Sequence, residues 1–387
     1  MNGTIYMPVG EVCSSISDTY REKKNMVTLI NTSDVLEGRV LNHERVPNSN
    51  LKGQFKKTFQ RDDILYSEIR PQNRRFAYVD FSPIDYIAST KLMVIRAKKD
   101  VVSPKYLYYF LKNSSTVAEL QLLAETRSGT FPQITFSEVA NLTIPVPSLA
   151  VQEVIVQTMQ CLEDKITCNE QINDNLQQQA FSVFDNLIAN AENNDYTVSD
   201  YAFLNPKRTL AKNQVARSID MSQLSTSGAF PSGWEMKPFN GGMRFTNGDT
   251  LLARITPCLE NGKTAFIDFL DDGEVAFGST EYIVLAPKND TPPEMLYCLA
   301  RYPAFVDYAV KNMNGSSGRQ RVSAETVGQY RLPLFDKHSL VLFKEVVSPM
   351  FSKMRYNSLE NMRLAELRDA LLPKLMSGEI DVSAVQL

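Results

Sequence analysis

Apolar residues recur at alternating intervals of four and three positions along two stretches of the chain, residues 151–188 and about 339–376. This spacing is typical of the seam of a coiled coil. In the first stretch, Asn169 and Asn173 interrupt the apolar seam. The second stretch repeats the seam 188 positions later, with Asn357 and Asn361 in the same places. The pattern therefore predicts two long helices built on one plan.

The simplest interpretation is that the two helices pair with each other in antiparallel orientation. The pairing would bring Asn169 and Asn173 close to Asn361 and Asn357. A buried amide costs free energy unless it finds a partner, so facing asparagines favour a single register. A helix of about 38 residues would span roughly 57 Å. The alternative is two unrelated helices, each packed on its own domain with its asparagines at the surface.

The region before the first long helix has the pattern of a mixed domain. Residues that favour β-structure cluster or alternate there, which predicts strands over residues 63–71, 75–81 and 89–99. Ser103 followed by proline predicts the start of a helix. A polar loop covers residues 125–135, and a short amphipathic turn follows it. Pro145 and Pro147 then require an extended chain before the long helix begins near Leu149.

The second half of the chain repeats the order of the first at an offset of 186 to 190 residues. The matching segments are 59–71 with 245–257, 89–98 with 279–288, 103–111 with 292–300, and 127–147 with 316–335. A tandem duplication predicts two domains of one fold that differ in their loops. We therefore expect an α+β protein with two globular mixed α/β domains and two long helices. The predicted boundaries are 1–149 (first domain), 150–192 (first helix), 193–337 (second domain) and 338–387 (second helix and tail).

Composition places the chain among ordinary globular proteins. Its 387 residues are 43% hydrophobic, and no run approaches 18 consecutive apolar residues. The N-terminal residues lack the basic start and apolar run of a signal peptide. The five cysteines show no CxxC pair, and there are only two histidines, His43 and His338. We expect a cytoplasmic protein with free thiols, no metal site and no cofactor.

The net charge of -3 argues at first against a partner that is a nucleic acid. The distribution of charge changes that conclusion. Residues 1–150 carry 19 Lys and Arg against 15 Asp and Glu, whereas residues 151–190 carry one lysine, Lys165, against six acids. Acidic residues are concentrated on the first long helix, so the charge of the whole chain is a weak guide to its partners.

Two segments carry a resemblance to a known family. They are GTFPQITFSEVANLTIPVPSLAVQ (129–152) and LRDALLPKLMSGEI (367–380). With the duplicated plan, they make the whole chain resemble the specificity subunit of a Type I restriction-modification system, in which two target-recognition domains are each followed by a helical spacer. The second proline junction departs from the family pattern at Phe335 and Asp336, which makes the start of the second helix less certain.

The resemblance implies a DNA reader without catalytic chemistry of its own. Each recognition domain would read one half of a bipartite target in double-stranded DNA. The helices would bind two methyltransferase subunits, and restriction/translocase subunits would join for cleavage. No cofactor is implied for this chain. Two readers about one helical turn apart, roughly 34 Å, would face the same side of the duplex.

The sequence contains no complete catalytic motif, which supports the same interpretation. The segment Asn205-Pro206 matches only the first half of an amino-methylation motif. The ENGKT segment (260–264) ends like a phosphate-binding loop, but Pro257 stands where glycine is required. The acidic pairs Asp62-Asp63 and Asp271-Asp272 could hold magnesium or could simply be solvated turns. We therefore expect a non-catalytic subunit.

Candidate DNA contacts are the polar residues of the two matching loops and nearby cationic pairs, since arginine and glutamine can read base edges and lysine positions the backbone. In the first domain they are Arg74, Arg75, Lys98, Lys99, Arg127, Ser128, Thr130 and Gln133; in the second they are Lys207, Arg208, Ser317, Arg319, Gln320 and Arg321. Any of these charges could instead belong to a solvated face, and the first loop could pack against the helices and the methyltransferase.

Two alternative classes and one closer variant stay open for the whole chain. A nuclease or methyltransferase that acts alone would need catalytic motifs that the sequence does not show, and incubation with DNA and a methyl donor, without partners, would reveal it. A duplicated coiled-coil adaptor that binds only proteins would share the helices but would show no salt-dependent affinity for DNA. A specificity subunit of a related defence system with a different methylase would share every feature above.

Overall fold

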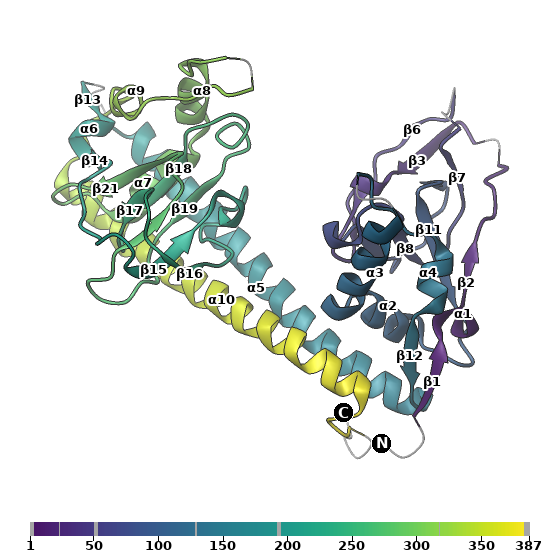
Figure 1. Ribbon diagram of the computed structural model, residues 1–387. Coiled ribbons are helices and arrows are strands. Elements are labelled where there is room, and N and C mark those ends of the chain that lie inside the picture. The colour runs from purple at the N-terminus through teal and green to yellow at the C-terminus, as the bar shows by residue number, and fades with distance from the viewer. Residues whose placement is uncertain are drawn as a thin grey trace. The chain divides into compact units, whose positions relative to one another are not determined.

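The computed structural model describes residues 4–22, 24–49, 53–127, 130–191, 195–316 and 318–382. The chain divides into two compact units, residues 1–163 with 365–387 and residues 164–364. The two long helices, α5 (Leu149–Ala189) and α10 (Lys337–Ser377), each contribute one portion to each unit. Figure 1 shows these two helices side by side and the sheet-rich parts of the chain that pack on them.

The first unit contains short strands and three helices of more than one turn. In chain order its elements are β1 (Ile5–Pro8), α1 (Val9–Val12), β2 (Cys13–Ile16), β3 (Met26–Ile30), η1 (Thr32–Asp34), β4 (Val35–Leu36), β5 (Arg39–Val40), β6 (Val46–Pro47), β7 (Phe55–Lys57), β8 (Ile64–Ser67), η2 (Pro71–Asn73), β9 (Phe76–Tyr78), β10 (Tyr86–Ser89), β11 (Leu92–Ala97), α2 (Pro104–Lys112), α3 (Ser114–Arg127), α4 (Phe136–Asn141) and β12 (Thr143–Val146). The strand predicted over residues 63–71 is shorter than expected, because the chain turns away after Ser67 to receive the loop that ends at Gln133.

The second unit has a corresponding series of elements. They are β13 (Tyr196–Thr197), α6 (Val198–Tyr201), β14 (Ala202–Leu204), β15 (Val215–Ile219), η3 (Met221–Gln223), β16 (Glu235–Pro238), β17 (Met243–Phe245), β18 (Thr250–Ala253), β19 (Thr264–Phe266), β20 (Ala276–Gly278), β21 (Tyr282–Pro287), α7 (Pro293–Arg301), α8 (Pro303–Lys311), α9 (Ala324–Gly328) and β22 (Arg331–Leu332).

Sheet topology establishes the duplication at the level of the fold. The described residues of the first unit form sheets in the orders β2-β11-β8-β9, β6-β3-β10-β7 and β1-β12, together with a small β4-β5 hairpin. Those of the second unit form β14-β21-β18-β19, β16-β15-β20-β17 and β13-β22. The one parallel pairing in each set, β3 with β10 and β15 with β20, falls in the same place. The predicted fold class, with two mixed domains and two long helices, is confirmed.

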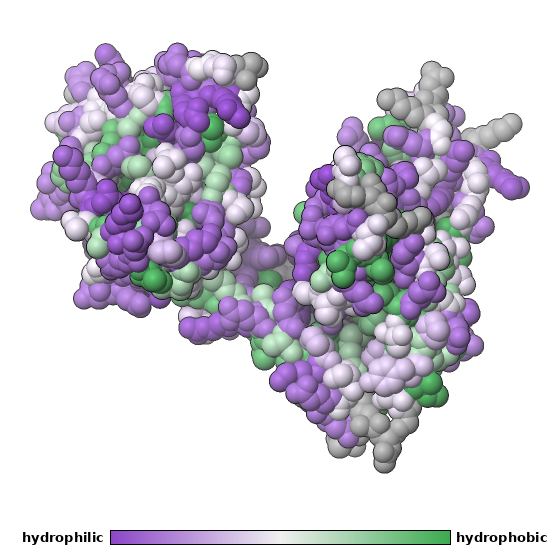
Figure 2. Space-filling model, viewed as in Figure 1, coloured by the Kyte–Doolittle hydropathy of each residue, from purple (hydrophilic) through white to green (hydrophobic). Residues whose placement is uncertain are grey.

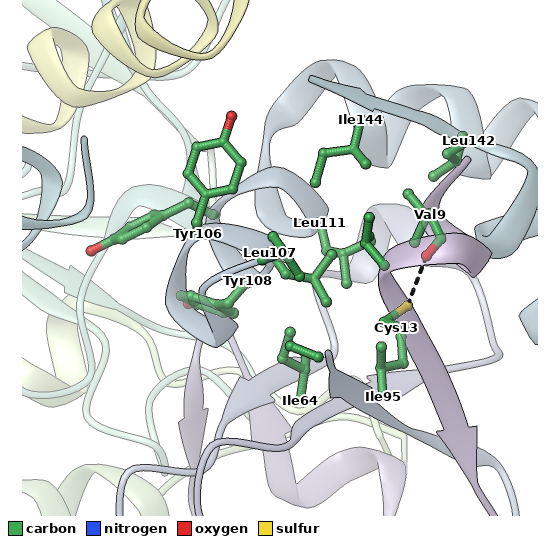
Figure 3. Close-up of a cluster of buried hydrophobic side chains, with 14 of the residues drawn as sticks. Val9, Cys13, Ile64, Ile95, Tyr106, Leu107, Tyr108, Leu111, Leu142 and Ile144 are labelled. Atoms are coloured by element: carbon green, nitrogen blue, oxygen red, sulfur yellow. Dashed lines mark hydrogen bonds between the residues drawn. The ribbon is translucent and has the colours of Figure 1, made fainter. Parts of the chain in front are cut away.

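The core of the first unit lies between α2 and the sheet that contains β8 and β11. Figure 3 shows Ile64 and Ile95 from the sheet facing Leu107 and Leu111 of α2. The same cluster includes Ile155 from α5, together with Leu372, Leu375 and Met376 from α10. The helices are thus part of the hydrophobic core of the unit.

Each unit fastens its globular part to the helices through side-chain contacts. In the first, Lys112 of α2 forms an ion pair with Glu163 of α5, and the Tyr109 hydroxyl donates to Glu163 at 2.9 Å. In the second, Tyr297 of α7 packs edge-on against Phe351 of α10, with ring centroids 5.5 Å apart. The second unit also has an ion pair between Arg355 of α10 and Asp268, at 3.1 Å, so both units attach to the helices partly through ionic contacts.

The proline junctions before both helices are held by buried tyrosines. Tyr106 donates its hydroxyl to the carbonyl of Pro145 at 2.9 Å, and Tyr201 donates to that of Pro333 at 2.8 Å. The first long helix begins at Leu149, as expected. The second begins at Lys337, slightly before the predicted start, because Asp336 accepts a hydrogen bond from the Ser339 amide at 2.9 Å and caps the helix.

The visible surface is largely hydrophilic, with apolar side chains scattered over it (Figure 2). Within the ranges that the structure covers, no helix carries an apolar run sufficient to cross a lipid bilayer.

Candidate nucleic-acid interface

Two matching loops carry most of the predicted DNA contacts, and both are attached to the fold in the same way. The first loop returns to β8 through a bridge between Ile69 and Gln133, and the second returns to β18 through a bridge between Ile255 and Arg321. One residue further on, the amide of Ile134 donates to the carbonyl of Glu68 at 2.9 Å. The amide of Val322 donates to the carbonyl of Arg254 at 3.0 Å. The duplication thus preserves the backbone of the loop attachment.

In the first loop, Thr130 is exposed and Gln133 is half-buried. Gln133 accepts a hydrogen bond from the Lys91 ammonium at 3.0 Å through its side-chain oxygen. Ser128 and the side chain of Arg127 lie outside the described residues.

The cationic pairs predicted for the first domain have partners within the fold. Arg74 donates to the Ser114 hydroxyl at 2.8 Å, and Arg75 donates to the carbonyl of Ser33 at 2.9 Å. Lys98 donates to the carbonyl of Glu11 at 2.8 Å, and Lys99 pairs with Asp62 at 2.6 Å. Their cationic charge is therefore partly used to tie segments together, although an exposed ammonium such as that of Lys99 can still face a phosphate.

In the second loop, Arg319 is exposed and Gln320 is half-buried; Ser317 lies outside the described residues. The backbone carbonyl of Gln320 accepts from the Thr256 amide at 3.0 Å. Arg321 forms a two-pronged contact with Glu281, with nitrogen–oxygen distances of 2.7 to 3.0 Å. These hydrogen bonds to the ionised carboxylate hold the pKa of Glu281 below its usual range.

The two residues of the last predicted pair, Lys207 and Arg208, differ in whether they form an ion pair within the described part of the chain. Arg208 reaches the buried carboxylate of Asp249 at 2.6 Å. Burial raises the pKa of Asp249 to about 6, and Arg208 opposes that rise. Lys207 is exposed, and no described residue forms an ion pair with it. Among the second unit's candidates, Lys207 and Arg319 therefore have the cationic groups most accessible to DNA.

Four residues at the loop attachments were missed by the sequence reasoning: Glu68, Lys91, Arg254 and Glu281. Lys91 contacts Glu68 at 3.3 Å as well as Gln133, and Arg254 contacts Glu281 at 3.2 Å. The repeat alignment could have found them. It places Lys91 and Glu281 at equivalent positions, 190 residues apart, where the charge changes sign between the two domains.

The four seam asparagines meet inside the helical pair. Asn169 donates to the side-chain oxygen of Asn361 at 2.8 Å, and Asn357 donates to that of Asn173 at 2.8 Å. Asn169 and Asn357 are completely buried. Since the partner number falls as the residue number rises, the helices are antiparallel.

Flanking charges extend this polar layer to the surface. Asn169 also donates to Glu360 at 2.7 Å, and Lys165 bridges Glu360 and the Asn169 side-chain oxygen. Hydrogen bonds from Asn169 and Lys165 hold the pKa of the Glu360 carboxyl below its usual range.

The acidic pairs considered for magnesium are largely engaged by cations. Asp63 pairs with Arg96 at 2.7 Å, and Asp271 lies 3.2 Å from Arg217. Within the described ranges, no group of three or more His, Cys, Asp or Glu side chains is arranged to hold a metal ion.

The chain is similar in sequence to known proteins. Residues 6–178 match the family model described as the Type I restriction modification DNA specificity domain. The Type I restriction enzyme HindI specificity subunit of Haemophilus influenzae is 29% identical, over 92% of this chain and 94% of its own length. The MjaIX specificity subunit of Methanocaldococcus jannaschii is 22% identical, over 78% and 76%. The predicted resemblance to Type I specificity subunits is confirmed.

A likeness of fold to one solved structure also extends through the second half of the chain. The crystal structure of a Type I restriction-modification system S subunit from M. genitalium superposes with a TM-score of 0.53 at 16% identity, covering 97% of this chain and 96% of that one. At this identity the likeness shows the fold alone. The stretch that matches the family model includes the first loop, β12 and most of α5.

Proposed function

We propose that this chain is the subunit that reads DNA sequence for a Type I restriction-modification complex, and that each globular domain reads one half of a bipartite target. The observation that carries the proposal is the repetition of three sheets and one loop attachment, with different side chains on the two loops. Thr130 in the first loop corresponds to Arg319 in the second. One scaffold with two different loops suits two different half-sites.

The helical pair would fix the spacing between the half-sites. Both helices have 41 residues, which corresponds to about 60 Å of helix. The buried asparagine layer selects one register, because only that register pairs the amides. A flexible linker would permit many spacer lengths, whereas a helical pair of defined register favours one.

The catalytic steps would belong to partners. Two methyltransferase subunits would bind the helices and turn the target adenine out of the duplex, and restriction/translocase subunits would join the same assembly. This chain would supply the position of those subunits on DNA, in keeping with its lack of a recognisable catalytic motif in the sequence.

The proposed DNA contacts are the residues named from the sequence other than Gln133 and Arg321, whose side chains are held by Lys91 and Glu281. Lys207 and Arg319 are favoured as phosphate contacts because both are exposed cations that form no ion pair with a described residue. Phosphate contacts position a protein on the duplex, and base contacts add specificity.

A DNA-binding titration at several salt concentrations tests the proposal, with this chain assembled on its methyltransferase subunits. We expect affinity to fall steeply with salt, and Lys207→Gln or Arg319→Gln each to reduce the slope of log K against log salt by about 0.9. Lys311→Gln is the matched control, since Lys311 is an exposed lysine of the same unit that is paired with Asp307. Affinity that does not depend on salt, or no affinity for DNA, would favour the protein-only adaptor.

A further inference from the structure

Three charged side chains meet at the attachment of the second loop, and each comes from a different segment. Arg254 follows β18, Glu281 lies in the turn between β20 and β21, and Arg321 closes the loop. Glu281 lies 3.2 Å from Arg254 and 2.7 Å from Arg321. Arg321 also donates to the backbone carbonyl of Arg319 at 3.2 Å. The arginine that closes the loop therefore also holds the backbone near its tip.

The first loop has three side chains in the equivalent places; two of them have the opposite charge, and the third, Gln133, is neutral. Glu68 stands where the second unit has Arg254, Lys91 where it has Glu281, and Gln133 where it has Arg321. Lys91 lies 3.3 Å from Glu68 and donates to Gln133 at 3.0 Å. A central cation between two acceptors thus replaces a central anion between two cations.

The surrounding backbone is the same in both units, so the inversion is confined to the side chains. The amide of Glu68 donates to the carbonyl of Lys91 at 3.0 Å, and the amide of Arg254 donates to that of Glu281 at 3.0 Å. Each trio is complementary only within itself. Arg321 beside Lys91 would place like charges together, and Gln133 beside Glu281 would leave the central anion with a weaker partner.

We propose that the two trios, Glu68-Lys91-Gln133 and Arg254-Glu281-Arg321, are latches that position the recognition loops, so that Gln133 and Arg321 act as positioning residues for base reading. The inference rests on the proposed function, because it assigns these residues a part in sequence discrimination. It also makes each loop specific to its own domain, and a loop transferred between the domains would need its whole trio.

Charge reversal at the centre of one latch, followed by restoration, tests the proposal in the complete assembly with its methyltransferase. Glu281→Lys places three cations together. We expect it to lower discrimination at the half-site of the second domain by about tenfold, the scale of one charge-assisted hydrogen bond. Discrimination at the other half-site should not change. The triple variant Arg254→Glu, Glu281→Lys and Arg321→Gln rebuilds the first unit's trio and should restore discrimination.

Lys91→Glu is the matched control, and it should reduce discrimination only at the half-site of the first domain. If Glu281→Lys does not fold, Glu281→Gln replaces it as the test variant, and a thermal melt checks that Glu281→Gln is folded. The proposal is overturned if folded Glu281 variants retain full discrimination, or if the triple variant is no better than Glu281→Lys alone.

Amide hydrogen exchange in the free chain separates this proposal from the proposed function. Asn314 and Arg321 exchange two backbone hydrogen bonds of 2.9 Å across the neck of the second loop. We expect both amides to exchange faster in Glu281→Gln, and unchanged rates would contradict the latch. Faster exchange in the variant would support the latch as an anchor of the loop. If the wild-type complex then showed no sequence preference for DNA, the part of the latch in base reading and the proposed function would both be refuted.

Discussion

The five cysteines lie in environments of different accessibility, although none is part of a disulfide. Cys13 and Cys298 are buried in the two domain cores. Figure 3 shows the Cys13 thiol donating to the carbonyl of Val9, at 3.2 Å. Burial raises the pKa of Cys13 to about 12 and also raises that of Cys298. Cys161 and Cys168 are exposed on α5.

We expect an alkylating reagent at about pH 8 to modify Cys161 and Cys168 quickly and to leave Cys13 and Cys298 unmodified, because the reactive species is the accessible thiolate. A time course read by peptide mass spectrometry would measure each site, and the denatured chain should be labelled at all five. If Cys13 reacted as fast as Cys161 in the native chain, the packing described for the first core would be wrong.

Among the secondary-structure elements, α5 and α10 show how a polar layer can specify a pairing. Asn169 is fully buried but has three polar neighbours, Lys165, Glu360 and Asn361. Leucine at these positions would pack in several registers with similar energy, whereas the amides pair in one. The layer therefore contributes specificity more than stability.

We predict that Asn169→Leu combined with Asn361→Leu raises the melting temperature by a few degrees and widens the range of tolerated spacers between half-sites. The base preference of each half-site should not change. Binding to a set of targets that differ only in spacer length would measure this, and Asn175→Leu, an exposed position on α5, is the control. Altered half-site preference with unchanged spacer tolerance would contradict the role of the helices as a spacer.

The helices and the duplication could be predicted from the sequence because both are periodic signals. The seam asparagines have a fixed spacing, and the strands reappear at a nearly constant offset. The surroundings of individual cations could not be predicted in this way. Arg208 and Arg321 are paired by Asp249 and Glu281, which lie 41 and 40 residues away in the chain. A contact at such a separation depends on tertiary packing, so the sequence alone did not distinguish these arginines from the exposed Arg319.

For the whole molecule, the central feature is one fold used twice with different loop chemistry. The sheets and the loop attachments are repeated, while Glu68 and Lys91 in the first loop trio carry charges opposite to those of Arg254 and Glu281 in the second. This repetition is the basis of our proposal that the molecule reads two half-sites. Residues 6–178 match the model of the Type I specificity domain, and the second half of the chain repeats the sheet topology of the first.

The most direct test of the account is a genome-wide map of methylated adenines in cells that express this chain with its methyltransferase subunit, compared with cells that express the methyltransferase alone. We predict a bipartite motif with one fixed spacer that appears only when this chain is present. If the two proteins form a complex and no new motif appears, the chain is not the reader of DNA sequence, and the protein-only adaptor becomes the better account.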